Sequence, residues 1–317
     1  RCVMDTTADG IYFNDNSICN YCLEFEKKLH KLKKNQNDIV VLKNRIKHNG
    51  RNKEYDCIVG LSGGVDSCYT LHKVFEMGLR PLVVHMDNGW NSELAQNNIE
   101  NIVKKLNLDL FTYVIDWNEY RNMMDSFFES DVIDIELLMD NAMLSVNYQQ
   151  ASKNNIKYIL AGTNTATEGM AMPTNMNWFK YDKKNILNIL KIYGKQKIKS
   201  FPIISTLDLI YYILFKNIKW ISFLDYFNYN KKESIETLKS NYNFKPYPYK
   251  HYESVFTRFY QGYILPKKFK VDKRKLHFST LIISKQMHRD DALKQLSSEH
   301  AYLSDEELQN DKEYFLK

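Results

Sequence analysis

The stretch DCIVGLSGGVDS, residues 56–67, decides the fold class of this chain. Its first half is apolar and predicts a buried strand, and its second half is a glycine-rich turn that opens a helix. Two adjacent glycines allow a tight turn whose N–H groups can face phosphate oxygens, and the helix N-terminus adds partial positive charge. Ser62 and Ser67 can donate hydroxyl hydrogen bonds, and Asp66 can hold the loop or approach a metal ion. The stretch therefore predicts a phosphate-binding loop.

The lysine of a Walker loop, G-x-x-x-x-G-K-[ST], is missing from this stretch, so a GTPase or kinase is a poor interpretation. An ordinary glycine-rich turn is the alternative to phosphate binding. The residues predicted to contact a nucleotide here are Leu61, Ser62, Gly63, Gly64, Val65, Asp66 and Ser67.

Strands and helices alternate on either side of the loop. The predicted strands are 55–61, 80–86, 110–115, 158–161 and 219–224, and the predicted helices run from the loop to about residue 77 and over 93–106, 120–129 and 135–154. Such alternation is typical of a doubly wound parallel α/β sheet, which binds ligands at the carboxyl ends of its strands. The most apolar stretch, 203–227, is interrupted by charged residues and is predicted to pack in the core rather than to contact a membrane.

Composition divides the 317 residues into four parts. We expect a Cys-rich unit at 1–25, a linker helix at 26–50, an α/β domain at 51–235, and a helical, basic and aromatic region at 236–317. The linker helix is indicated by a charged helical pattern over 24–47. The formal net charge of +6 favours anionic partners such as nucleotides, sugar nucleotides or RNA.

Five cysteines cluster early in the chain. The spacing of Cys2, Cys19 and Cys22 is typical of a zinc site, because thiolates suit tetrahedral Zn²⁺, and free thiols are the alternative. Cys57 and Cys68 are interpreted as small core residues. A secreted disulfide scaffold would spread its cysteines along the chain, so the pattern predicts a reducing cytoplasm.

Residues 62–67 match in full the S-G-G-x-D-S signature of the PP-loop ATP pyrophosphatases, and the chain resembles that superfamily in two further segments. GTNTATE at 162–168 is similar to the G-T-x-N-x-S-E segment of NAD synthetases, although the spacing differs by one residue. NKKE at 230–233 is similar to a K-x-E element that begins a late helix. The resemblance implies cleavage of ATP to AMP and pyrophosphate with the help of Mg²⁺.

The same resemblance implies roles for particular residues. His85 and Asp87, at the end of the second strand, are expected near the adenylate, and a core histidine is the alternative for His85. The implied catalytic residues are Ser62, Asp66 and Lys231; the further nucleotide ligands are Gly162, Thr163 and Glu168; and the Mg²⁺ ligands are Asp66 and Glu168.

Within the superfamily, the chain resembles the N-acetyl sugar amidotransferases of surface-polysaccharide and nonulosonic acid biosynthesis, the WbpG-like and PseA-like proteins. The similar segments are RCVM at 1–4, CNYC at 19–22, VHMDNGWNSE at 84–93, HYESVFTRFYQGYILPKKF at 251–269 and DKRKLH at 272–277. The resemblance is weakest over 170–219. It implies that an acetamido group on an activated sugar becomes an acetamidino group, through an O-adenylated imidate that ammonia then attacks.

The late run mixes cations with aromatic residues and is interpreted as substrate-binding. His251, Arg258, Lys267 and Lys268 are the candidate ligands of a carboxylate or phosphate. A helix with its aromatic face in the core and its cations in water is the alternative.

The resembled family also implies partners. A separate glutaminase would supply ammonia, since this chain lacks a nucleophilic cysteine on a strained elbow. Another cysteine shortly before Arg1 would be the fourth zinc ligand. A tRNA-modifying thiolase is the alternative function, although such enzymes need cysteines in the catalytic half and none follows Cys68. A catalytically silent ATP-binding subunit is a third interpretation. Nucleic-acid binding is disfavoured, and no membrane contact is expected.

Overall fold

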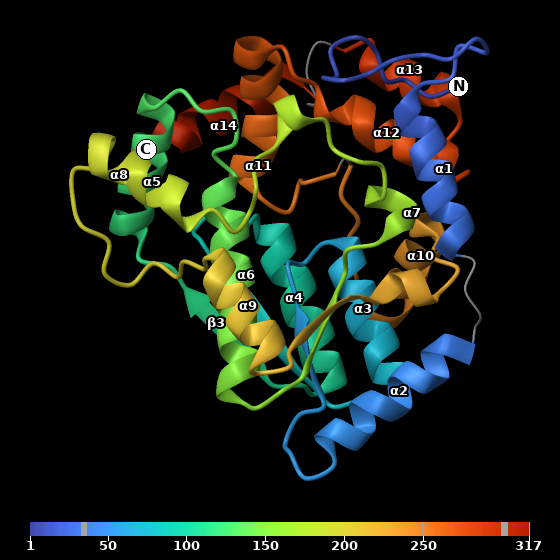
Figure 1. Ribbon diagram of the computed structural model, residues 1–317, viewed down its shortest axis with the longest axis vertical. Helices are drawn as coiled ribbons and strands as arrows, with labels where there is room; N and C mark the ends of the chain where they lie inside the picture. Colours follow the sequence, from blue (N-terminus) through green and yellow to red (C-terminus); the bar gives the residue numbers. More distant parts are fainter. Residues whose placement is uncertain (33–36, 249, 299–303, 317) are drawn as a thin grey trace.

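The computed structural model describes residues 1–32, 37–248, 250–298 and 304–316. Its centre is a parallel sheet with strand order β3-β2-β1-β4-β5 (Figure 1). The strands are β1 (Cys57–Gly60), β2 (Pro81–Asp87), β3 (Leu110–Val114), β4 (Tyr158–Ala161) and β5 (Lys219–Ser222). Every pair is parallel, which confirms the predicted fold class.

Helices cover both faces of this sheet. Cys57 and Val59 of β1 pack in the cluster that includes Leu71 and Val74 of α3, whereas Ile58 packs in the cluster on the opposite face. Alternate residues of a strand point to opposite faces, so a continuous apolar run is what a doubly covered strand requires. Among the described residues, α3 (Val65–Glu76) and α6 (Leu137–Lys153) pack directly on the strands. The helices α4 (Glu93–Leu106) and α10 (Lys231–Tyr242) pack against α3, and α5 (Trp117–Glu129) follows β3.

The strand order reverses at β1. The chain runs outward from β1 through β2 to β3, then returns to the other side of β1 for β4 and β5. At such a switch point the loops after neighbouring strands diverge and leave a crevice at the carboxyl ends. The glycine-rich loop follows β1 and the segment 162–168 follows β4, so the topology brings the two predicted nucleotide segments together.

The single charged helix expected over 24–47 is wrong. The described residues form two helices, α1 (Asn20–Leu32) and α2 (Asn37–Gly50), and the intervening residues 33–36 lie outside the described ranges. The two helices bury their apolar residues in different places. Cys22 and Phe25 of α1 pack in the cluster that contains much of the C-terminal region, while Leu42 and Ile46 of α2 pack with α3.

The C-terminal region is helical, as predicted. Its helices are α11 (Val255–Phe259), the π-helix η3 (Tyr260–Phe269), α12 (Lys273–Ile283), α13 (Arg289–Leu296) and α14 (Asp305–Leu316). Phe256, Tyr260 and Leu265 share one core cluster with Phe127 of α5 and with Cys22. The N-terminal unit and the C-terminal region therefore pack together, and α1 lies against α12 (Figure 1). The four-part division of the chain stays a prediction.

The expectation that 203–227 packs in the core holds only in part. Ile218, Phe223 and Leu224 are buried, but α9 (Thr206–Leu214) is mostly exposed. Leu207 and Leu214 are 77% and 71% exposed, because α9 contacts the rest of the protein mainly through Leu209 and Tyr212. Shorter elements before it are α7 (Thr165–Glu168), η1 (Thr174–Met176) and α8 (Lys183–Tyr193), and η2 (Phe223–Tyr226) follows β5. Across the described ranges, each helix is either too short or too polar to cross a lipid bilayer.

Candidate active site

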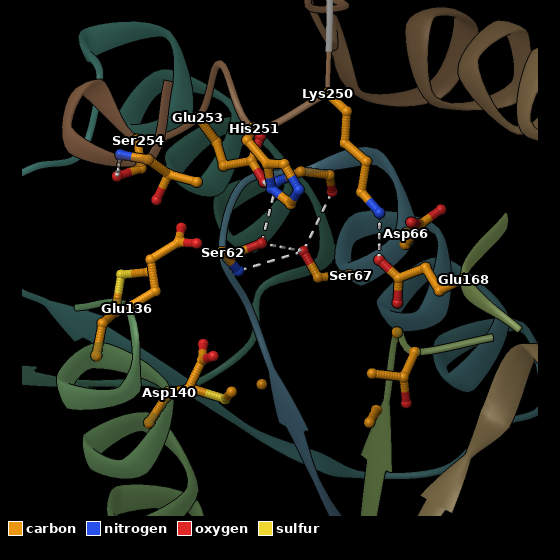
Figure 2. Close-up of a pocket in the computed structure, with 18 of the residues that line it drawn as sticks. Ser62, Asp66, Ser67, Glu136, Asp140, Glu168, Lys250, His251, Glu253 and Ser254 are labelled. Atoms are coloured by element: carbon orange, nitrogen blue, oxygen red, sulfur yellow. Dashed lines mark hydrogen bonds and ion pairs between the residues drawn. The ribbon is translucent and has the colours of Figure 1, made fainter. Parts of the chain in front are cut away.

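A cavity of about 620 Å³ opens at the carboxyl ends of the strands. Its walls come from the loop after β1, the end of β4 and the segment behind it, α6, and the C-terminal region. Figure 2 shows the serines of the loop at the centre, with Glu168 and Lys250 on one side and Glu136 and Asp140 of α6 on the other. The cavity is large enough for a nucleotide and part of a second substrate.

The loop is built before any ligand arrives. Gly63 has φ +80°, and a Cβ there would lie 2.6 Å from the carbonyl oxygen of Ala95, so only glycine fits. The Ser62 N–H donates to Ser67 Oγ at 3.2 Å, and the Ser67 hydroxyl donates to the Gly64 carbonyl at 3.1 Å. Tyr247 holds the loop from outside, because its hydroxyl donates to the Gly63 carbonyl at 2.9 Å.

The end of β4 approaches the loop closely. A Cβ on Gly162 would lie 2.8 Å from the backbone nitrogen of Ser67, so glycine permits this contact. Gly162 and Thr163 line the cavity, and Asn164 caps α7 by accepting from the Thr167 N–H at 2.9 Å. The short helix α7 thereby turns Glu168 into the cavity.

Asp66 and Glu168 face the same part of the cavity. Burial and the neighbouring Glu168 carboxylate raise the pKa of Asp66, and the Tyr229 hydroxyl donates to Asp66 Oδ1. Burial alone would raise the pKa of Glu168, but Lys250, whose Nζ is 2.7 Å from Glu168 Oε1, brings it below the usual value. Two carboxylates that face one polar cavity are the hard oxygen ligands that Mg²⁺ prefers, so these residues fit the ion.

Cations surround the carboxylates. Lys231 is the first residue of α10 and lines the cavity, and Asn230 caps that helix by accepting from the Lys232 N–H at 3.0 Å. Lys250 and His277 line the same part and were missed by sequence reasoning. The sequence signal for Lys250 was its position directly before the run interpreted as substrate-binding.

The end of β2 contributes His85 but not Asp87. His85 lines the cavity, with Nδ1 2.8 Å from the Leu61 carbonyl oxygen and Nε2 3.1 Å from Asn91 Nδ2. Burial lowers the pKa of His85, so a neutral ring donates to Leu61 and accepts from Asn91. Asp87 accepts from the Gly89 N–H at 3.0 Å and does not line this cavity. His85 thus also supports the base of the loop.

The structure brings one of the four predicted substrate ligands to the cavity. His251 lines it, with its ring centroid 5.5 Å from that of His277. Arg258 instead pairs with Asp311, its Nε 2.7 Å from Oδ2. Lys268 pairs with Asp131, and Lys267 is also outside the cavity wall. For Arg258, Lys267 and Lys268 the geometry therefore favours the alternative interpretation, in which the cations of the helix do not contact the substrate.

One stripe of α6 lines the opposite wall. Its members are spaced at three, four and seven residues, which places them on one face of a helix, and they are Glu136, Met139, Asp140, Met143 and Asn147. Glu136 caps the start of α6, and its carboxylate accepts from Lys273 at 2.9 Å and from Gln261 at 2.8 Å. Burial would raise the pKa of Glu136, and Lys273 lowers it overall. Sequence reasoning missed this stripe, because its spacing is also that of an ordinary core helix.

Two buried side chains of this wall have an atom without a partner. Thr257 Oγ1 and Asn147 Oδ1 make no hydrogen bond to the described residues, although the residues are only 4% and 3% exposed. Both residues line the cavity. Buried polar atoms are nearly always paired, so these two are candidates for contact with a ligand. Thr257 lies one turn before the π-helix, a rare element that is frequent at functional sites.

Three cysteines form a cluster away from this cavity. The sulfurs of Cys2, Cys19 and Cys22 all lie within 4.8 Å of one another, and all three residues are buried. Hydrogen bonds among the three thiols lower the pKa of Cys2 and raise the pKa values of Cys19 and Cys22, so the cluster favours one thiolate, on Cys2. The Cys22 N–H also donates to Cys19 Sγ at 3.4 Å. The three sulfurs could therefore hold one metal ion.

The C-terminal region matches a known family. Residues 253–317 fit the family model described as "LPS biosynthesis protein WbpG-like, C-terminal domain", which confirms the resemblance for this region. The matched residues include Thr257, Gln261, Lys273 and His277 of the cavity wall. No curated relative matches the sequence.

Three solved structures illustrate the similarity of the fold. The U34-tRNA thiolase NcsA from Methanococcus maripaludis is 12% identical with a TM-score of 0.38, covering 88% of this chain and 80% of that chain. The NH3-dependent NAD synthetase from Campylobacter jejuni is 15% identical with a TM-score of 0.33, covering 66% and 94%. The NMN synthetase from Francisella tularensis is 15% identical with a TM-score of 0.33, covering 70% and 93%. We base no function on likenesses this distant.

Proposed function

We propose that this chain, whose C-terminal region belongs to the WbpG-like family, is an ATP-dependent amidotransferase. It converts an acetamido group of an activated sugar into an acetamidino group and releases AMP and pyrophosphate. The observation that supports this best is one cavity lined by the S-G-G-x-D-S loop, by Asp66 and Glu168, and by the WbpG-like region.

We place the triphosphate of ATP on the side of the cavity where Glu168 lies. The backbone N–H groups of the loop, the N-terminus of α3 and the cations Lys231 and Lys250 all suit phosphate oxygens. Asp66 and Glu168 would hold Mg²⁺, which neutralises phosphate charge when bound. The pyrophosphate is thereby stabilised as a leaving group.

We place the second substrate, the acetamido sugar, against the cavity wall formed by α6. Glu136 is paired with Lys273, and Asp140 with Lys180 at 2.9 Å, so this wall offers balanced charges to a ligand. Such a wall suits the hydroxyl and amide groups of a sugar better than a second phosphate. Thr257 Oγ1 and Asn147 Oδ1 are the free polar atoms that such groups would meet.

The chemistry requires positioning rather than a covalent enzyme nucleophile. The amide oxygen of the acetamido group attacks the α-phosphorus of ATP, and the bond to pyrophosphate breaks. Ammonia then adds to the imidate carbon, AMP leaves with the former amide oxygen, and a proton is lost to give the amidine. The loop and the facing wall of α6 hold the two substrates in one cavity, which is the main contribution a protein can make here.

The test is turnover with ATP, an ammonium salt and a panel of acetamido sugars, free and nucleotide-linked. We expect one sugar to yield a product lighter by the difference between O and NH, together with stoichiometric AMP and pyrophosphate. ADP and orthophosphate as products would contradict the proposal.

Ammonia is proposed to come from a separate glutaminase. No cysteine lines the cavity in the described part of the chain, and burial raises the pKa of the Cys57 and Cys68 thiols, which makes both poor nucleophiles. The same lack of a cysteine among the described residues of the cavity wall argues against a tRNA thiolase. We place the reaction in the cytoplasm, where ATP is available and the thiols of the cluster stay reduced.

The purified chain is therefore expected to use ammonium but not glutamine. Turnover with glutamine alone should stay at the level without any nitrogen donor, and adding a cognate glutaminase should raise it to the ammonium rate. The measurement is AMP release with each donor. Glutamate release by this chain alone, abolished by Cys68→Ala, would refute the expectation.

A further inference from the structure

Lys250 lies between two groups of the phosphate side. Its Nζ is 2.7 Å from Glu168 Oε1 and 3.1 Å from His277 Nδ1. Figure 2 shows the side chain reaching from the segment above the cavity to Glu168. The Lys250 ammonium thus lies beside the Glu168 carboxylate, which is one of the two expected to bind Mg²⁺.

His277 accepts from the ammonium because the ring is neutral. Burial lowers the pKa of His277 well below its usual value, and the neighbouring cations Lys250 and Lys231 lower it further. A neutral imidazole has one nitrogen free to accept a hydrogen bond. Lys250 is therefore held by one anion and one neutral acceptor in this conformation.

The carboxylates need a cation nearby. Asp66 and Glu168 both line the phosphate side of the cavity, and two carboxylates that face one space repel each other. Lys231 and Lys250 both act against this repulsion. Lys250 supplies the positive charge that Glu168 contacts directly.

We propose that Lys250 is a tethered counter-ion of Glu168 that stands in for the divalent cation in the nucleotide-free protein and moves to the phosphates when Mg²⁺–ATP binds. Binding brings both a stronger cation for Glu168 and new anions for the ammonium. The move asked of Lys250 is one of its side chain, and Tyr247, three residues earlier, donates a hydrogen bond to the Gly63 carbonyl of the loop. A lysine suits this role, since its charge sits on a flexible four-carbon stem.

The proposal rests on the proposed function only in that ATP and a divalent ion bind this cavity. It predicts that Lys250 competes with the metal when no nucleotide is present. Removing the ammonium should therefore tighten metal binding to the empty protein, while it weakens binding of ATP. A residue that merely supports the structure would weaken both.

The experiment measures Mn²⁺ binding to the nucleotide-free protein by electron paramagnetic resonance, with Mn²⁺ as the probe for Mg²⁺. Lys250→Met is expected to bind Mn²⁺ about tenfold more tightly than the native protein, because one opposing charge beside two carboxylates is gone. It should also bind ATP, without metal, about tenfold more weakly. Lys245→Met is the matched control, since it removes an exposed lysine from the same segment and should change neither affinity.

Unchanged or weaker Mn²⁺ binding by folded Lys250→Met would overturn the proposal. Lys250→Gln, which keeps a hydrogen-bond donor without the charge, should tighten Mn²⁺ binding equally and guards against misfolding of the methionine variant. Metal binding needs neither sugar nor turnover, so tighter Mn²⁺ binding together with no amidine product would reject the proposed function and leave the counter-ion role standing.

Discussion

Replacing Asp66 with asparagine is expected to lower kcat for AMP release by about a thousandfold. Asp66 is half-buried in the first turn of α3 and shares its part of the cavity with Glu168, so it is the carboxylate best placed to hold the divalent ion beside the phosphates. Asparagine has nearly the same shape and still accepts from the Tyr229 hydroxyl. The measurement is pyrophosphate release at saturating ATP.

The same change should leave stability intact or raise it. The raised pKa of Asp66 means that the fold disfavours its charged form, so removing the charge at pH 7 relieves a cost. This cost is absent at low pH, where the carboxyl is protonated, and is fully present above the raised pKa. Asp125→Asn, on an exposed position of α5, is the control and should alter neither activity nor thermal unfolding. Activity within tenfold of native for folded Asp66→Asn would contradict the assignment.

Removing metal from the cysteine cluster is expected to lower the free energy of unfolding by several kcal/mol. Cys22 is fully buried and packs in the core cluster that joins α1 to the C-terminal region, so loss of the cluster affects both. We propose zinc as the metal, because buried clusters of cysteine thiolates are typical ligands of structural Zn²⁺. Cys22→Ser should destabilise the protein similarly and should abolish the further effect of a chelator.

Elemental analysis gives the composition of the cluster directly. The purified chain is expected to hold zinc at the three cysteines, and Cys22→Ser is expected to lose it. Cys68→Ala is the control, because it removes a buried thiol outside the cluster and should keep both the metal and the sensitivity to chelator. Absence of zinc from the native protein would contradict the assignment.

The parts of the fold set by local pattern were predictable. The helix over Glu93–Leu106 and the strand over Tyr158–Ala161 have the predicted bounds. Helix caps and apolar runs depend on residues close together in the sequence, so they can be predicted from it. The loop and the end of β4 were found for the same reason. Their convergence followed from the rule that parallel strands place their carboxyl ends at one edge.

The rest of the site depends on contacts between distant segments. Lys250, His277 and the α6 stripe meet only because the C-terminal region folds back over the sheet, and nothing in their local sequence distinguishes them from surface or core residues. The same holds for Arg258, whose partner Asp311 is more than fifty residues away. The exposure of α9 could not be predicted either. An apolar helix is expected in the core, and the sequence does not show that no other element covers it.

The central claim is that the amide oxygen of the substrate becomes bonded to the α-phosphorus of ATP. The most direct test uses the sugar selected in the product assay, carrying ¹⁸O in its acetamido group, with ATP and ammonium. The AMP formed is then examined by mass spectrometry. We predict one ¹⁸O atom in each AMP and none in pyrophosphate; AMP without the label would contradict the mechanism.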